Sequence, residues 1–148
     1  MNGLEKQLGL IAKIKPEVKY GVEGKSRIDL LLKPETSNSD SRNIFVEVKN
    51  TTWCEKTLAL FPDTVTTRGQ KHLRELMSIC PNSRAVLIPC ISRSDMEIFA
   101  PCDLADPSYG QLFRKAISTG VEVIPCAFGF FLDHITWEGV KPFKISQK

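Results

Sequence analysis

The sequence predicts an α/β protein, a three-layer α/β/α sandwich around a mixed central sheet. Its segments follow the order helix, three strands, helix, strand, helix, strand. The first three strands are joined by links of hairpin length, which favours antiparallel pairing, whereas the later strands alternate with helices, which favours parallel pairing. The length of 148 residues predicts a single domain spanning 1–148.

The N-terminal third is expected to hold one helix and three strands. Residues 4–13 carry apolar side chains at helical spacing, and Pro16 is expected to end this helix. Glycines at 21–24 predict a turn, and the polar stretch 35–43 predicts a loop. The predicted strands are 17–20, 27–33 and 44–49.

The middle of the chain predicts an irregular segment, 50–66, followed by a clear helix, 67–80. Four apolar residues of this helix lie at i, i+3, i+4 and i+7, which is one helical stripe. Thr67 and Gln70 have the spacing of a capping box at its start.

The C-terminal part alternates strands and helices. Residues 84–91 are nearly all apolar, which predicts a strand buried on both faces. Asp106 followed by proline predicts the start of a helix, and Gly120 its end. Further strands are predicted at 121–124 and 128–132.

The composition is that of an ordinary globular chain, with 42% hydrophobic and 25% charged residues. It excludes a disordered or collagen-like protein, and no apolar run is long enough for a membrane span. Five cysteines lack zinc-type spacing, and the N-terminus lacks the apolar core of a signal peptide. We therefore expect reduced thiols, a cytoplasmic location and no membrane partner.

The net charge of +3 conceals an uneven distribution. Residues 1–33 carry seven basic and four acidic side chains, and residues 68–93 carry five and one. Residues 94–138 carry two basic and seven acidic side chains. The basic and acidic segments nearly cancel in the net charge. We expect the basic segments to form a side that faces phosphate and the acidic segment to form the opposite side.

Three charged residues interrupt the predicted strands, namely Asp29, Glu47 and Lys49. Residues i and i+2 of a strand project from one face, so Glu47 and Lys49 point together, and Asp29 joins them if the strands pair. Two close carboxylates favour a divalent cation, and a neighbouring lysine suits metal-assisted phosphodiester hydrolysis. The alternative is an ordinary alternating strand with Glu47 and Lys49 in solvent.

The first turns of the 67–80 helix are crowded with polar and basic side chains: Arg68, Gln70, Lys71, His72 and Arg74. A basic first turn opposes the helix dipole, so a bound phosphate would explain it. The alternatives are a solvated face with a Lys71–Glu75 pair, a capping role for Gln70 and a surface position for His72.

Three further residues are candidates for auxiliary roles. Glu5 and Glu17 are candidate outer carboxylates, and a solvent-facing position is the alternative for Glu5. Arg27, close before Asp29, is a candidate phosphate contact, with an ordinary strand-end position as its alternative.

Several strings of residues resemble the sugar fermentation stimulation protein A (SfsA) family over residues 14–126. They are SRIDLLL, FVEVKN, FPDTVTTRGQKHLRELM, RAVLIPCISRSD and GVEVIP. The resemblance implies a PD-(D/E)XK (restriction endonuclease-like) fold and DNA binding. Family members place an OB-like domain before this fold, and we expect that domain to be absent here.

The resemblance also implies roles for individual residues. Asp29 corresponds to the family's strand aspartate, and the run Glu47, Val48 and Lys49 to its E-x-K motif. The first hypothesis is therefore a DNase using Mg²⁺ or Mn²⁺, with Asp29, Glu47 and the Val48 carbonyl as metal ligands. Lys49 would position the attacking water and stabilise the developing charge.

Two other hypotheses stay open at this stage. One is a non-catalytic DNA-binding regulator of sugar-utilisation genes that keeps the nuclease fold. The other is an adaptor that binds protein through the acidic 94–138 face. DNA is the expected partner, RNA is an open alternative, and a homodimer is a further expected arrangement.

Overall fold

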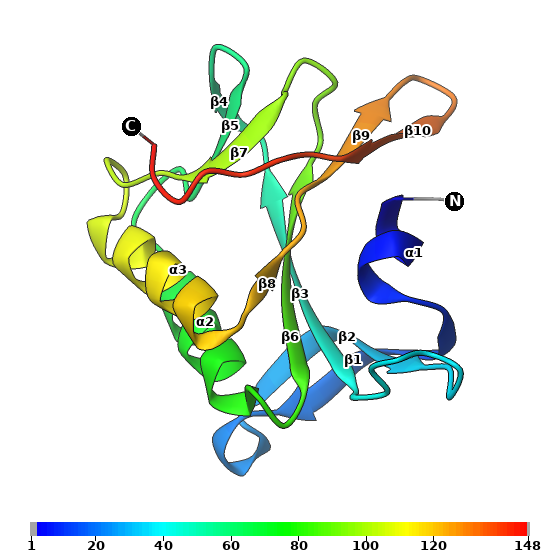
Figure 1. The fold of residues 1–148 in the computed structure, drawn as a ribbon. Helices are drawn as coiled ribbons and strands as arrows, with labels where there is room; N and C mark the ends of the chain where they lie inside the picture. Colours follow the sequence, from blue (N-terminus) through cyan, green and yellow to red (C-terminus); the bar gives the residue numbers. More distant parts are fainter. Residues whose placement is uncertain (1–2, 148) are drawn as a thin grey trace.

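The computed structural model describes residues 3–147 as a mixed α/β fold (Figure 1). The larger sheet has seven strands, in the order β1-β2-β3-β6-β9-β10, with β8 paired to β6. Its strands are β1 (Ile11–Tyr20), β2 (Ser26–Pro34), β3 (Ile44–Thr51), β6 (Arg84–Ile91), β8 (Glu122–Val123), β9 (Cys126–Phe130) and β10 (Ile135–Val140). The first three strands pair antiparallel, whereas β6 lies parallel to β3 and to β9, as the connection lengths predict.

The helices cover both faces of this sheet (Figure 1). Helices α2 (Thr67–Ile79) and α3 (Pro107–Thr119) pack on one face, where Leu73, Leu76 and Phe113 enter the larger core cluster. The short α1 (Gly3–Leu8) lies on the other face, where Leu8 joins a second cluster. No helix within residues 3–147 is long and apolar enough to cross a membrane.

The first helix is shorter than the predicted 4–13. It ends at Leu8 because Gly9 adopts a left-handed φ of 77°. Ile11 then begins β1, so the prediction that Pro16 ends the helix was wrong. Pro16 lies inside β1, which is an edge strand, where a missing N–H is tolerated.

A second sheet occupies part of the segment predicted to be irregular. Strands β4 (Trp53–Glu55) and β5 (Leu58–Phe61) form a hairpin, and β5 pairs in parallel with β7 (Ile98–Pro101). These strands have only three or four residues each, too few to display a periodic pattern. Their pairing also depends on a partner far along the chain.

The helix caps differ in how well the sequence predicted them. Asp106 caps α3 by accepting a hydrogen bond from the Tyr109 amide at 2.9 Å, and Gly120 ends the helix with a φ of 110°. These two predictions are confirmed. The cap of α2 is Thr66, which accepts from the Gly69 amide at 3.0 Å, rather than the Thr67 of the predicted capping box.

Candidate functional site

The candidate site lies where β2 and β3 separate. Their ladder covers only residues 30–32 of β2, opposite 44–46 of β3, although β3 continues to Thr51 beside β6. Just beyond the end of the ladder, the Asp29 carboxylate accepts a hydrogen bond from the Val48 amide at 2.7 Å. The side chain thus replaces a missing backbone acceptor and keeps the opening between the strands in place.

Glu47 is the most enclosed charged group of this opening, with 2% of its surface exposed. One of its carboxylate oxygens, Oε1, contacts both the Lys49 ammonium and the His72 imidazole. Lys49 Nζ in turn lies 2.9 Å from His72 Nδ1. Burial alone would raise the pKa of Glu47, but the contacts with His72 and Lys49 hold that pKa below its ordinary value. Glu47 is therefore ionised at neutral pH.

The second oxygen of Glu47, Oε2, is buried and has no hydrogen-bond partner within the described part of the chain. A buried, unpaired carboxylate oxygen is costly, and a bound cation would satisfy it. The Val48 amide faces the opening, so the carbonyl of the same residue lies on the same edge of β3. The two carboxylates and this carbonyl are oxygen donors, which suit a hard divalent cation.

Residues 3–147 contain no preformed group of three or more His, Cys, Asp or Glu side chains able to hold a metal. This finding limits the kind of ion that fits. Mg²⁺ keeps several of its waters and binds through one or two carboxylates, so it does not need a group of three such side chains. A site that needs four protein ligands does not match this geometry.

A cleft of about 420 Å³ opens beside these carboxylates. Charged and polar side chains from both strands and the turn of the β1–β2 hairpin and from α2 line it: Glu17, Lys25, Ser26, Arg27, Asp29, Arg68, Lys71 and His72. Arg27 lies 3.9 Å from Glu17, and Lys71 lies 3.6 Å from Glu75. The side chains of Arg27 and Lys71 are both exposed to solvent. The cleft therefore contains four basic side chains together with the Asp29 carboxylate.

Six candidates from the sequence do not line this cleft. Glu47 and Lys49 reach it only through their contacts with His72, and Val48 through the hydrogen bond from its amide to Asp29. The other three lie elsewhere. The Gln70 amide donates to both oxygens of Asp106, at 3.1 and 3.0 Å, so it links α2 to α3. Arg74 is exposed further along α2. Glu5 is exposed on α1 and borders an apolar groove beside Leu30 and Val46, away from the cleft.

Three further residues lie near Glu47: Ser26 and Tyr20, which sequence reasoning did not single out, and Glu75, which it named only as a partner of Lys71. The Ser26 hydroxyl donates to Glu75 Oε1, while the second oxygen of Glu75 and the Tyr20 hydroxyl are buried without a partner among residues 3–147. Burial raises the pKa of Tyr20, and the charges of Glu47 and Glu75 raise it further. The available signal was that Glu75 follows His72 by three positions, on the same helix face.

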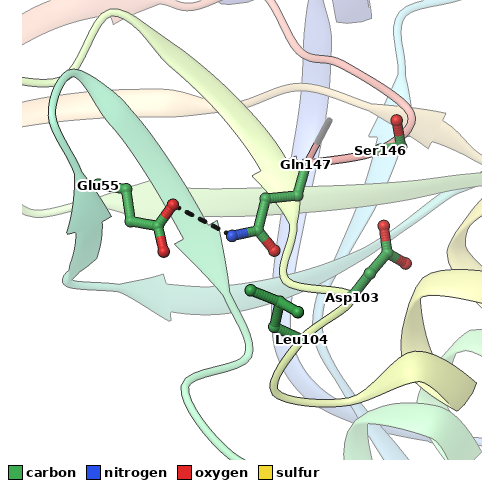
Figure 2. A pocket seen from close by; sticks show the side chains of 5 residues that line it. All are labelled: Glu55, Asp103, Leu104, Ser146 and Gln147. Carbon is green, nitrogen blue, oxygen red and sulfur yellow. Dashed lines mark hydrogen bonds between the residues drawn. The ribbon is translucent and has the colours of Figure 1, made fainter.

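A second pocket, of about 500 Å³, lies near the C-terminal segment (Figure 2). It is lined by Glu55, Asp103, Leu104, Ser146 and Gln147. The Gln147 amide donates to Glu55 at 3.2 Å across it (Figure 2). Among residues 3–147, its lining contains no basic side chain, unlike that of the cleft beside Asp29.

Comparisons with known proteins agree on one family. The family model described as "Sugar fermentation stimulation protein RE domain" matches residues 1–133. A sugar fermentation stimulation protein homolog of Prochlorococcus marinus strain NATL2A is 74% identical over 147 residues, covering 99% of this chain and 57% of the relative. A homolog of strain MIT 9211 is 65% identical over 140 residues, covering 95% of this chain and 55% of the relative.

One solved structure has the same fold over most of the chain. It is Pyrococcus furiosus SfsA in complex with Ca²⁺, which matches with a TM-score of 0.76 and 28% sequence identity. The match covers 90% of this chain and 55% of that protein. This chain therefore spans little more than half the length of the relatives it matches.

Proposed function

This chain belongs to the sugar fermentation stimulation protein (SfsA) family, and we propose that it is a nuclease domain that binds DNA and hydrolyses phosphodiester bonds with a divalent metal ion. The proposal includes a PD-(D/E)XK fold, with α1 forming one outer layer and α2 with α3 the other. The split between β2 and β3, with Asp29 on one strand and Glu47 with Lys49 on the next, supports it. The single observation that carries the proposal is the unpaired, buried oxygen of Glu47 beside a basic cleft.

Glu47 Oε2, the Asp29 carboxylate and the Val48 carbonyl would hold Mg²⁺ or Mn²⁺. The relative solved with Ca²⁺ supports a divalent cation, because Ca²⁺ and Mg²⁺ both prefer oxygen ligands. When bound, the ion would supply Lewis-acid activation of a water and neutralise charge on the phosphate. Asp29 would keep its hydrogen bond to the Val48 amide and so fix the spacing of the two strands.

Lys49 would place its ammonium beside the scissile phosphate, where it stabilises the charge that develops in the transition state. His72 holds Lys49 Nζ at 2.9 Å and also contacts Glu47 Oε1. These contacts occupy one oxygen of Glu47 and leave the other for the cation. His72 is therefore a positioning residue in this proposal.

Arg27, Arg68 and Lys71 would bind backbone phosphates on either side of the scissile bond. All three line the cleft, and none is buried by another element. Contacts of this kind carry no base information, so binding would be independent of sequence and sensitive to salt.

A non-catalytic DNA-binding regulator is the second candidate. The observation that favours it is that residues 3–147 hold no preformed group of three metal-ligating side chains. In that case Lys49 and His72 would serve only to neutralise Glu47, and the basic cleft would bind DNA without cutting it.

Cleavage of labelled single- and double-stranded DNA separates the two candidates. Wild type should cleave with Mg²⁺ or Mn²⁺ and stop on chelation, and both Glu47→Gln and Lys49→Ala should lower the rate by at least 100-fold. Lys115→Ala, an exposed lysine on α3, serves as the matched control and should retain full activity. DNA binding without cleavage under any divalent metal would favour the regulator instead.

A further inference from the structure

The β1–β2 hairpin places like charges directly opposite each other. Lys13 pairs with Lys33, and Lys19 pairs with Arg27, in the antiparallel register. Directly opposed like charges destabilise a sheet. Within the described residues, no acidic group forms an ion pair with Lys13, Lys19 or Lys33. Glu17 offers Arg27 an acidic partner at 3.9 Å, but the repulsion between Lys13 and Lys33 is not offset by any ion pair of the described residues.

Part of this charge lies on the face of the sheet that bears Glu47. Leu31 lies directly opposite Phe45, and Glu47 follows Phe45 by two positions, so Leu31 and Glu47 share a face. Lys33 follows Leu31 by two positions and so lies on that face as well. Lys13, directly opposite Lys33, completes this part of the surface.

Lys15 extends the same surface, because it lies directly opposite Leu31. Lys13, Lys15 and Lys33 are all exposed, and β1 is the edge strand of the sheet. Lys33 lies four residues along β2 from Asp29, which corresponds to about 13 Å. These three lysines, the lysine track, thus lead from the cleft toward the far end of the hairpin.

We propose that the lysine track binds the sugar–phosphate backbone of a nucleic acid at a distance from the bond that the cleft acts on. This inference rests on the proposed function, because the cleft supplies the other end of the path. Basic side chains that begin in the cleft and continue to Lys33, about 13 Å along β2 from Asp29, suit an extended polyanion rather than one small anion. The opposed lysines would be relieved of their repulsion when phosphates lie between them.

The test measures DNA affinity against salt concentration by fluorescence anisotropy, with a chelator present to prevent cleavage. The track variant carries Lys13→Gln, Lys15→Gln and Lys33→Gln. The matched control carries Lys6→Gln, Lys115→Gln and Lys144→Gln, exposed lysines elsewhere that lose the same charge. The track variant should reduce the slope of log affinity against log salt by about 2 to 3, and by more than the control.

Thermal unfolding gives an independent readout. If the lysines repel each other, the track variant should unfold at the same or a higher temperature than wild type at low salt. If the three lysines instead stabilise the fold, the track variant should unfold at a lower temperature than wild type.

Each other outcome overturns the inference in a distinguishable way. If wild type binds DNA and the track and control variants give equal slopes of log affinity against log salt, the track lysines do not bind phosphates. The proposed function is then unaffected. If wild type does not bind DNA even at low salt, both the lysine-track inference and the proposed function are wrong. Track-dependent binding of vesicles containing anionic phospholipid, with DNA binding unaffected, would assign the lysines to a membrane surface.

Discussion

At the scale of single residues, the site depends on how Glu47 is neutralised. Its carboxylate is almost fully buried, and the Lys49 side chain beside it is 15% exposed. Burying a charge is expensive unless a partner remains, so each member of this pair depends on the other.

Replacing Lys49 by methionine should therefore destabilise the protein. Lys49→Met keeps the apolar stem but leaves Glu47 with His72 as its remaining partner. We expect the free energy of unfolding in urea to fall by about 2 kcal/mol. Lys115→Met at an exposed site should change it by less than about 0.5 kcal/mol, and equal effects of the two substitutions would contradict the account.

The cleft also distinguishes between two arginines of one helix. Arg68 lines it and Arg74 does not. Arg68→Ala should weaken DNA binding and reduce the salt slope by about 1, whereas Arg74→Ala should have a smaller effect. Salt-dependent anisotropy on both variants checks this, and an equal loss would show that the cleft does not define the contact surface.

The sequence was informative for residues whose partners are close along the chain. Asp29 was singled out because it interrupts a predicted strand, and it bonds the amide of Val48 on the neighbouring strand. Gln70 was harder, because its partner Asp106 lies 36 positions away and no local pattern joins them. Its spacing from Thr67 favoured a capping box that the structure does not contain.

At the scale of elements, Asp106 connects the two long helices. It caps α3 and also accepts from the Thr66 amide at 2.9 Å and from the Gln70 side chain. The start of α2, which carries Arg68 and Lys71 into the cleft, is thereby held against α3. The site thus depends on a contact outside it.

Asp106→Asn should lower the free energy of unfolding by about 2 kcal/mol at neutral pH. Burial opposes ionisation of Asp106, but hydrogen bonds from Gln70 and from backbone amides hold its pKa below the ordinary 3.8. The stability that the ionised form contributes is present above pH 3.8 and is lost as pH falls through the lower folded value. Urea unfolding across pH should show the difference from wild type shrinking in acid, and a pH-independent difference would contradict this.

Long, periodic elements were predicted well and short ones were not. Helices α2 and α3 and strand β6 have clear patterns and lie within a residue or two of the predicted bounds. The sheet formed by β4, β5 and β7 was missed because its stability comes from pairing between distant segments. Likewise, α1 ends early because the conformation of Gly9 overrides the apolar spacing.

At the scale of the whole molecule, the net charge of +3 does not show which basic side chains form ion pairs and which do not. Arg84, Arg93 and Arg114 are each paired with an acid, at 2.7, 2.7 and 2.9 Å. The track lysines and Arg68 have no such pair within residues 3–147. The hairpin and the start of α2 therefore carry positive charge that no ion pair offsets.

This distribution predicts strongly salt-dependent DNA binding. Six phosphate contacts would reduce affinity by about 1,000-fold between 50 and 200 mM salt. They come from Arg27, Arg68 and Lys71 of the cleft and from the three track lysines. Fluorescence anisotropy titrations of DNA across that salt range test whether the cleft and the lysine track both bind phosphates. Affinity that is nearly constant with salt would contradict it.

The central claim is that Glu47 and Asp29 hold a divalent cation, and a crystal soaked in Mn²⁺ tests it directly through anomalous scattering. We predict a peak between the two carboxylates in wild type, within bonding distance of Glu47 Oε2, and its loss in Glu47→Gln. No peak in wild type at a concentration of Mn²⁺ that supports cleavage, or an equal peak in both proteins, would contradict the claim.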